Sequence, residues 1–524
     1  MVFRNVNTYH NMVRDGQARL YDLRYEGEIE IMTKDLALGP KQYPLVIDGQ
    51  RITGRSHFDD RSPIDENIIV GRFPRGSAED VDAAVDAAKR AFSDWSRADL
   101  ETRLGIFTKA ADIMDEERFR LAAAITYDNG KNRHEAIAEV DEAIDFVRYY
   151  VGCMKENNGF SNETPRAYED ERSQSVLRPY GVWAVICPFN FPLAISCGMM
   201  TGAMVTGNTV VVKPASPAPL MPYLYYDILE RAGLPPGVMN VVTGGGAEVG
   251  GRLTAHPEIS GFVFTGSKEV GFDLIKRSLR RYPVPVIAEM GGKNPAVVMP
   301  SADLEKAVRG IAHSAFSYSG QKCSACSRAY VHEEIFDDLV GRLVRRTESL
   351  RFGDPRKADT YSGPVIHAKA VQDYERYVEM ARKDGKVHCG GKKIEVPGLK
   401  GYYVAPTIVT GLHEDHFLLK NELFLPILCV QRVRSLEEAL RKANDVDFGL
   451  TAGIYSTERS EIEYFFDNIE AGVCYANRAR GATTGAMVGS QPFCGWKASG
   501  STGKGTGTAL YLTQFMRQHA RTIQ

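Results

Sequence analysis

The sequence predicts an α/β fold built on a doubly wound parallel sheet, and three observations support this. Short apolar runs typical of buried strands, such as residues 182–187 and 209–212, alternate with helical segments. The uncharged stretch from Tyr180 to Val212 has the continuous hydrophobic character of parallel strands. The 524 residues suffice for two or three domains, and 44% hydrophobic with 25% charged residues is typical of globular proteins.

The predicted elements follow in chain order. Amphipathic helices are expected over residues 78–95, 103–127 and 131–150, packed beside the sheet. The sheet region should then contain strand 182–187, loop 188–191, a helix beginning at Pro192, strand 209–212, helix 223–231 closed by Gly233, strand 238–242, a Gly-rich turn, a short helix ending near Ala255, strand 261–264 and a helix from Ser267.

A second α/β series is predicted after Gly291, consisting of helix 304–316, strand 329–332, helix 335–350 and strands near 402–409 and 428–432. The polar run 165–178 predicts an exposed excursion, and residues 513–523 predict a terminal strand. Both segments are candidates for contacts between subunits.

Charge and cysteine content exclude several classes of protein. The 64 Lys+Arg residues balance 66 Asp+Glu residues, leaving a charge of −2, so we expect no nucleic-acid partner. Nine irregularly spaced cysteines do not form the framework of a small secreted domain, and no targeting segment is visible in residues 1–30, so we expect a cytoplasmic protein. Because Pro188 and Pro192 interrupt the uncharged stretch, no membrane span is expected.

Three residues are candidates for catalysis. Cys323 lies in a glycine-led loop after an apolar helix, where an accessible thiol can act as a nucleophile, whereas Cys326 is interpreted as packing. Glu289 ends an apolar strand, so its carboxylate should lie at the carboxyl edge of a sheet and serve as a general base. Asn190 lies in a loop bounded by two prolines and offers an amide donor for an oxyanion.

Signals for a cofactor are weaker. The segment from Gly244 to Gly250 has one residue too many for the common dinucleotide motif, but Gly266 and Ser267 follow a strand and open a helix, which favours a pyrophosphate. Lys213, at the end of a strand, is placed to contact ribose hydroxyls. No phosphate-binding loop of the NTPase type is present, and residues 413–416 lack the spacing of metal ligands, so no metal is expected.

Together and in this order, the segments Pro188–Pro192, Val212–Pro214, Glu289–Lys293 and Gly320–Arg328 resemble the NAD(P)-dependent aldehyde dehydrogenase superfamily from about Tyr43 to the end. The resemblance implies a Rossmann-type coenzyme domain, an α/β catalytic domain and a small β oligomerisation arm. It makes Cys323 the nucleophile, Glu289 the general base and Asn190 the oxyanion donor. The coenzyme-binding residues that it implies are Ile186, Pro188, Lys213, Ser216, Gly244, Gly250, Gly266, Ser267, Glu422 and Phe424.

The implied coenzyme is NAD, with NADP as the alternative. Members of the superfamily that prefer NAD often carry an acidic residue three positions after the lysine that precedes Pro214. Here that position is Ser216, which does not repel a 2′-phosphate.

Within the superfamily, Gly320–Arg328 and Thr484–Phe493 resemble the 1-pyrroline-5-carboxylate dehydrogenases. This implies oxidation of L-glutamate γ-semialdehyde to L-glutamate through a cysteine thiohemiacetal and a thioester, in proline degradation. A glutamate on the helix before the first βαβ unit, Glu135 or Glu139, would bind the amino group. The other substrate-binding residues implied are Phe191, Ser324, Gly485, Ala486 and Phe493.

The implied division of the chain has six parts: an N-terminal arm with the helical part of the coenzyme domain (1–164), an oligomerisation excursion (165–180), the coenzyme-binding core (181–288), the catalytic domain (289–482), a substrate anchor loop and return (483–504) and a C-terminal oligomerisation strand (505–524). A homo-oligomer, dimer or higher, is expected. Three alternatives remain: an enzyme for another semialdehyde of the 2-aminoadipate or succinate type, a cofactor-free Cys/Glu hydrolase, and a non-enzymatic protein on a dehydrogenase scaffold.

Overall fold

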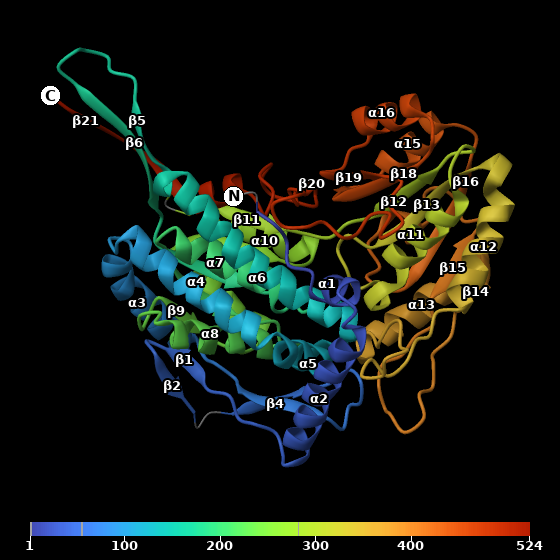
Figure 1. Cartoon of the computed structure of the whole chain (residues 1–524), viewed down its shortest axis with the longest axis horizontal. Coiled ribbons are helices and arrows are strands. Elements are labelled where there is room, and N and C mark those ends of the chain that lie inside the picture. Colours follow the sequence, from blue (N-terminus) through green and yellow to red (C-terminus); the bar gives the residue numbers. More distant parts are fainter. Residues whose placement is uncertain (1–2, 54–55, 281) are drawn as a thin grey trace.

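The structure, a computed structural model, describes residues 3–53, 56–280 and 282–524. Figure 1 shows two α/β halves side by side and a thin arm that projects from one of them. The first half is built on a seven-stranded sheet with the order β11 (Val286–Glu289), β10 (Ile259–Thr265), β7 (Val182–Ile186), β8 (Thr209–Lys213), β9 (Met239–Val241), β1 (Leu45–Ile47) and β2 (Gln50–Ile52).

The strands from β11 to β9 are parallel, and β1 joins antiparallel. Their register aligns the carboxyl ends: Thr265 pairs with Glu289, and Ile186 pairs with Lys213. From β7 the following strands β8 and β9 lie on one side, whereas β10 and β11 lie on the other, so the strand order reverses between β7 and β10. Open α/β sheets bind ligands in the crevice at the carboxyl ends of the strands next to such a reversal.

Helices cover both faces of this sheet. Successive residues of a strand point to opposite faces, so each face has its own set of buried side chains for helices to pack against. Trp183 and Val185 belong to a core shared with helices on one face, whereas Val182 and Ala184 belong to a core on the other. The first core contains α4 (Leu100–Glu116), α5 (Arg118–Asn129), α6 (Arg133–Glu156), α7 (Ala194–Val205) and α8 (Leu220–Ala232); the second contains α3 (Ala78–Trp95), α9 (Gly251–Ala255) and α10 (Lys268–Arg277).

The second half has its own seven-stranded sheet, which the chain enters between Glu289 and Asn294. Its order is β14 (Lys386–Cys389), β15 (Thr407–Thr410), β16 (Ile427–Val433), β13 (Cys326–His332), β12 (Asn294–Val298), β18 (Thr451–Tyr455) and β19 (Val473–Ala476), parallel except at β14. The helices packed against it are α11 (Leu304–Phe316), α12 (Phe336–Glu348), α13 (Ala368–Asp384), α15 (Leu436–Asn444) and α16 (Arg459–Asn468).

The projecting arm is a three-stranded antiparallel ribbon in the order β21 (Met516–Ile523), β6 (Arg172–Pro179) and β5 (Ser161–Thr164). Side chains of β21 after Met516 are all exposed. The excursion and the terminal strand that the sequence predicts therefore lie side by side in one element (Figure 1).

Strands β1 to β4 were not predicted, because the region before residue 78 was expected to hold only an N-terminal arm. The hairpin of β3 and β4 lies near α2 in Figure 1. The remaining elements are α1 (Thr8–Arg14), α2 (Ala18–Ala37), β3 (His57–Arg61), β4 (Ile69–Pro74), α14 (Phe417–Lys420), β17 (Phe448–Gly449), β20 (Trp496–Lys497) and α17 (Ala509–Thr513).

The α/β class and most predicted elements are confirmed, with two corrections. The single helix predicted over 103–127 is two helices, because the backbone of Glu117 leaves helical geometry and the Arg118 Nε donates to the freed Asp115 carbonyl at 3.0 Å. The helix predicted to begin at Pro192 begins at Ala194, because the Leu193 and Ala194 N–H groups bind a carboxylate of α6.

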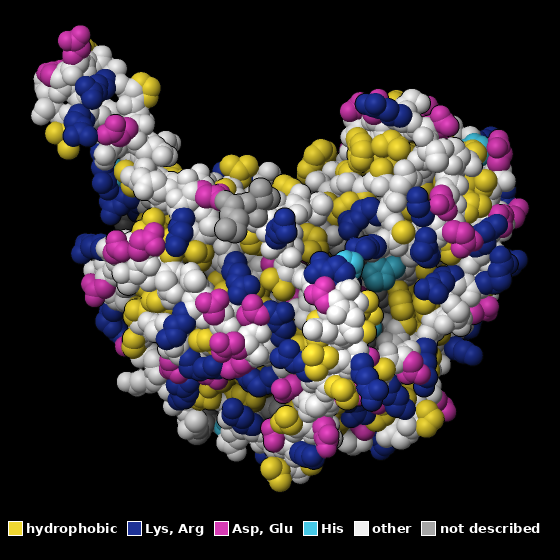
Figure 2. Space-filling model, viewed as in Figure 1, with side chains coloured by type: hydrophobic (Ala, Val, Ile, Leu, Met, Phe, Trp, Pro, Cys, Tyr) yellow, Lys and Arg dark blue, Asp and Glu magenta, His cyan; other side chains and the backbone are white. Residues whose placement is uncertain are grey.

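The uncharged stretch is divided among β7, α7 and β8. Of the helices in the described ranges, none has the length and apolar character needed to cross a membrane. Figure 2 shows Lys and Arg side chains intermixed with Asp and Glu over the visible face, in keeping with the balanced charge.

Candidate active site

The loop that carries Cys323 is held rigidly between two elements of the second half. It follows a 3-10 turn, Ser317–Gly320, in which Tyr318 and Ser319 have φ angles of 49° and 52°, in the left-handed region that non-glycine residues rarely adopt. The Asn294 side-chain amide donates to the carbonyl of Cys323 at 2.7 Å and to that of Ala325 at 2.9 Å. The loop is therefore tied to the first residue of β12.

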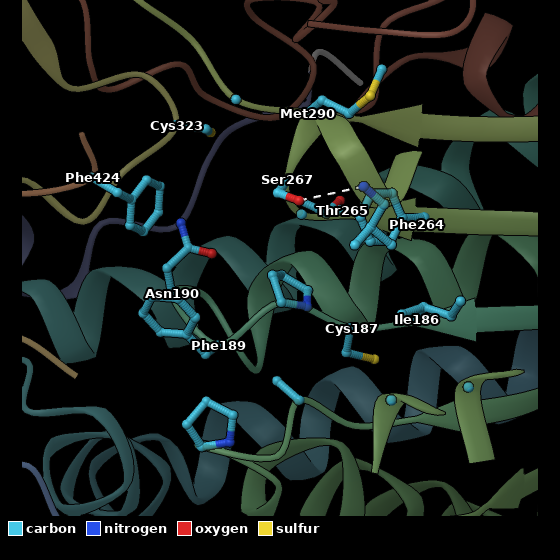
Figure 3. Close-up of a pocket in the computed structure, with 18 of the residues that line it drawn as sticks. Ile186, Cys187, Phe189, Asn190, Phe264, Thr265, Ser267, Met290, Cys323 and Phe424 are labelled. Carbon is cyan, nitrogen blue, oxygen red and sulfur yellow. Dashed lines mark hydrogen bonds between the residues drawn. The ribbon is translucent and has the colours of Figure 1, made fainter. Parts of the chain in front are cut away.

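Cys323 lies where two cavities meet. A larger cavity of about 760 Å³ and a smaller one of about 250 Å³ both have Cys323 in their walls. Its side chain is partly exposed, so the thiol is accessible from either space. Of the predicted catalytic residues, Asn190 also lines the larger cavity, and Figure 3 shows its side chain near those of Cys323 and Phe424.

The larger cavity lies at the carboxyl ends of β7, β8 and β10, which contribute Ile186, Lys213 and Thr265. Ser216 and Gly244 are not among the residues that line it, and they contact each other through a bond from the Ser216 hydroxyl to the Gly244 carbonyl at 3.3 Å. The predicted coenzyme residues in its wall are Ile186, Pro188, Lys213, Gly250, Gly266, Ser267, Glu422 and Phe424 (Figure 3 labels Ile186, Ser267 and Phe424).

Asn190 connects the loop before α7 with the loop that carries Cys323 through a hydrogen bond. The side chain is 4% exposed, and its Nδ2 donates to the Gln321 carbonyl at 3.2 Å. An amide nitrogen has two hydrogens, so a second donor remains for a group in the cavity. This arrangement suits the stabilisation of an oxyanion on a carbon bonded to Cys323.

Glu289 is not among the residues that line either cavity. Its carboxylate is buried at the end of β11, and its Oε2 has no hydrogen-bond partner in the described part of the chain. Burial raises the pKa of Glu289 to about 8, partly offset by a hydrogen bond from the backbone of Gly495. The group can therefore hold or release a proton near neutral pH.

Burial and two carboxylates raise the pKa of Cys323. Desolvation is the largest cause, followed by the charges of Glu422 and Glu289, and together they raise the pKa of the thiol to about 12. Glu422 itself accepts a hydrogen bond from the Gly292 N–H at 3.1 Å, and burial raises its pKa to about 7. The thiol form therefore predominates at neutral pH in the protein alone.

All five predicted substrate residues, Phe191, Ser324, Gly485, Ala486 and Phe493, line the smaller cavity. The backbone around Ser324 is fixed, because its carbonyl accepts from the Thr483 hydroxyl at 2.7 Å. The loop with Gly485 is held by the Arg478 guanidinium, which donates to the Gly485 carbonyl at 2.9 Å. The cavity thus combines two aromatic rings with a hydroxyl and a glycine-containing loop.

Comparisons with known proteins agree with this site. The model of the aldehyde dehydrogenase family matches residues 51–520. The chain belongs to the aldehyde dehydrogenase family. A 1-pyrroline-5-carboxylate dehydrogenase of Geobacillus sp. (strain WCH70) is 38% identical over 489 residues, 92% of this chain and 93% of that protein. The 1-pyrroline-5-carboxylate dehydrogenase 2 of Bacillus subtilis (strain 168) is 38% identical over 508 residues, 95% of this chain and 96% of that protein.

Among solved structures, the 1-pyrroline-5-carboxylate dehydrogenase from Thermus with bound NAD superposes with a TM-score of 0.93 and 34% identity, over 100% of this chain and 99% of that one. The family membership and the aldehyde dehydrogenase fold that the sequence motifs predict are thereby confirmed. The roles of the individual site residues remain predictions that rest on the geometry.

The larger cavity fits the dinucleotide that aldehyde dehydrogenases use. Its wall contains the N-terminus of α10, where Ser267 accepts from the Val270 N–H at 3.4 Å, and such a terminus favours a pyrophosphate. A side chain built at Gly246 or Gly251 would meet open space, so the backbone there is accessible to a ligand. The Lys213 ammonium and the Glu422 carboxylate are suited to ribose hydroxyls.

The sequence motifs missed an acidic residue in the smaller cavity. Glu135 pairs with Lys322 at 2.6 Å, and Glu139 pairs with Lys131 at 2.5 Å, so both candidates for an amino-group ligand already have cationic partners. Glu142 lines the cavity and has no hydrogen bond or ion pair within the described residues. Burial raises its pKa to about 8. The spacing of the three glutamates at i, i+4 and i+7, which places them on one helix face, was the available signal.

No group of three or more His, Cys, Asp and Glu side chains suited to a metal ion occurs among the described residues. His416, in the segment with two histidines, contacts Asp384 through its Nε2 at 3.2 Å. Cys326 is 1% exposed in β13 and packs in the core of the second half.

Proposed function

We propose that this protein oxidises L-glutamate γ-semialdehyde to L-glutamate with NAD as coenzyme, as a step of proline degradation. One observation carries the proposal: Cys323 stands between a cavity suited to a dinucleotide and a cavity with groups suited to an amino acid. The relatives named 1-pyrroline-5-carboxylate dehydrogenase support the same substrate.

Catalysis starts at Cys323. The Cys323 thiol loses its proton to solvent water, its sulfur adds to the aldehyde carbon, and the second amide hydrogen of Asn190 stabilises the oxyanion of the thiohemiacetal. NAD, when held by the residues of the larger cavity, would supply the acceptor for the hydride of this carbon, and Cys323 would then carry a thioester. Glu289 takes a proton from a water molecule, whose oxygen attacks the thioester; the C–S bond breaks, and the thiol and glutamate are released.

The smaller cavity supplies the groups that recognise the amino-acid end of the substrate. The Ser324 hydroxyl and the backbone N–H groups of Gly485 and Ala486 donate to the α-carboxylate. Glu142 accepts the ammonium, and the rings of Phe191 and Phe493 flank the aliphatic chain. A substrate cation next to Glu142 lowers the pKa of that carboxyl, which favours the ion pair.

NAD is the preferred coenzyme in this proposal, with NADP as the weaker alternative. The similar Thermus 1-pyrroline-5-carboxylate dehydrogenase binds NAD, which supports NAD, whereas Ser216 has no charge to repel the 2′-phosphate of NADP. We further propose that the protein is a homo-oligomer joined through the arm of β5, β6 and β21, and that it works in a reducing, cytoplasmic compartment, because its nine cysteines are free thiols.

The test is reduction of NAD or NADP followed by absorbance with L-glutamate γ-semialdehyde, 2-aminoadipate semialdehyde and succinate semialdehyde. We expect kcat/KM to be at least about tenfold higher for glutamate semialdehyde, since one methylene is worth ~1–3 kcal/mol in a pocket. Cys323→Ala should abolish turnover and retain NAD binding in equilibrium dialysis. Dehydrogenase activity of Cys323→Ala, or a higher kcat/KM for another aldehyde, would contradict the proposal.

A further inference from the structure

The 3–8 segment, which leads into α1 and ends at its first residue, Thr8, lies along α6 and contributes to the wall of the smaller cavity. Val6 and Asn7 of this segment line the cavity together with Glu142 of α6. The segment contacts Asp141, Asp145 and Tyr149 of α6. These three residues follow one another at intervals of four and so share one face of the helix.

Backbone and side-chain hydrogen bonds attach the segment to the two aspartates. The Thr8 N–H and hydroxyl each donate to Asp141 at 2.7 Å, and the Val6 N–H donates to Asp145 Oδ1 at 2.9 Å. Asp141 and Asp145 are 4% and 2% exposed, so these bonds satisfy buried carboxylates that α6 does not satisfy itself. The Phe3 ring packs edge-on against Tyr149, with 5.0 Å between the ring centroids.

Asn5 makes the contact that reaches the substrate-binding loop. Its Nδ2 donates both to Asp145 Oδ2 at 2.9 Å and to the Val488 carbonyl at 2.8 Å. Its Oδ1 accepts from the Ser490 hydroxyl at 3.3 Å. One side chain therefore bridges α6 and the loop of residues 485–490, and both of these elements form walls of the smaller cavity.

The contacts from Asn5 add to the hydrogen bond by which Arg478 holds the 485–490 loop. Gly485 and Gly489 have φ angles of 84° and 75°, and glycines in this region lose more conformational entropy on ordering than other residues. The loop also supplies the N–H groups that the proposed function assigns to the substrate carboxylate. Its order before binding therefore lowers the entropic cost of binding.

We propose that Asn5 is a positioning residue for substrate specificity, which acts by holding the 485–490 loop against α6 so that Gly485 and Ala486 face the carboxylate of an amino-acid aldehyde. The inference rests on the proposed function and adds to it a residue far away in the sequence. Asn5 itself is not among the residues that line the cavity, so its effect on the substrate passes through the loop.

The test compares Asn5→Ala and Asn5→Asp with His10→Ala, an exposed residue of the adjacent helix α1. KM and kcat are measured for glutamate semialdehyde and for pentanal, which lacks the amino and carboxylate groups. Asn5→Ala removes three side-chain hydrogen bonds, two of them to the 485–490 loop, and should raise KM for glutamate semialdehyde about tenfold with little change in kcat. Asn5→Asp should raise it further, because an acceptor then faces Asp145 and the Val488 carbonyl. His10→Ala should behave as the parent, and the kinetics with pentanal should not change.

Hydrogen exchange of residues 485–490 provides a readout that does not depend on the substrate. Faster exchange in this loop in Asn5→Ala, but not in His10→Ala, is expected. An equal loss for both aldehydes, an unchanged KM or unchanged exchange in the loop would overturn the inference. If the parent protein does not oxidise glutamate semialdehyde at all, the proposed function fails, whereas the exchange experiment still decides whether Asn5 holds the loop.

Discussion

At the scale of single residues, the chemistry of the site depends on side-chain type, which the sequence displays, and on burial, which it does not. The glycine and proline context of Cys323 and Asn190 predicts accessible loops because the backbone restrictions of these residues are local. The pKa of Glu289 depends on its burial and on Gly495, more than 200 positions away. No local pattern carries that information.

The raised pKa of Glu289 leads to a prediction about pH. A base must be deprotonated, and a carboxyl with a pKa of about 8 becomes so only as the pH rises through that value. When hydrolysis of the thioester limits turnover, kcat should therefore increase from pH 6.5 to 9 with a midpoint near 8. Glu289→Gln should lower kcat by roughly 10²- to 10⁴-fold and remove this midpoint.

Steady-state kinetics over this pH range, with a burst-phase measurement of NADH, would check the prediction. The variant should still show a burst, because acylation of Cys323 precedes the step that needs the base. A variant that keeps the midpoint near pH 8 would show that another group titrates.

At the scale of elements, α6 shows how one helix distributes its acidic residues over different tasks. Glu135 pairs with Lys322 in the loop that carries Cys323, Glu139 pairs with Lys131, Glu142 lines the smaller cavity, and Asp145 binds the 3–8 segment. Amphipathic spacing predicted this helix, because periodicity reports which face is buried. It could not predict the partners, which come from elements distant in the chain.

The pair of Lys131 and Glu139 should be important for stability. Both side chains are 0% exposed, and Glu139 Oε1 also accepts from the Leu193 N–H at 2.8 Å, at the start of α7. The Lys131 ammonium lies 3.5 Å from the ring centroid of Phe191, and Phe191 lines the smaller cavity. Lys131→Met should lower the free energy of unfolding by about 3 kcal/mol, because it leaves a buried carboxylate without its partner.

Urea unfolding followed by fluorescence would measure this change. Lys34→Met is the matched control, because it removes a Lys–Glu pair that is exposed instead of buried. It should leave the urea midpoint almost unchanged. Equal effects of the two variants would contradict the structural role of the buried pair.

At the scale of the whole molecule, the site lies between two sheets that each have their own core. The larger cavity receives residues from both halves, for example Lys213 from the first sheet and Glu422 from the second half. The alternation of strand and helix predicted both halves, since parallel strands require crossover helices. The pairing of β1 and β2 with the first sheet was missed, because such short strands carry little periodicity.

The arm should join copies of this chain. The ribbon of β5, β6 and β21 projects from the body of the molecule (Figures 1 and 2). Such a ribbon is marginally stable by itself and presents its edge strands for pairing. We expect the parent protein to have at least twice the mass of one chain in light scattering after size-exclusion chromatography. Removal of residues 517–524 should give the mass of a single chain, with the thermal midpoint of the body largely retained. A parent protein with the mass of one chain would contradict this expectation.

The sequence by itself determined the α/β class and the family and supplied the candidates for the reactive groups, because these depend on local periodicity, motif order and side-chain chemistry. Tertiary structure alone decided which groups meet. It places Cys323 between two cavities, it leaves Glu142, unlike Glu135 and Glu139, with no cationic partner in the part of the chain that the structure describes, and it brings Asn5 against the 485–490 loop. The physical reason is that burial and hydrogen bonding act between atoms close in space, and folding brings them together from opposite ends of the chain.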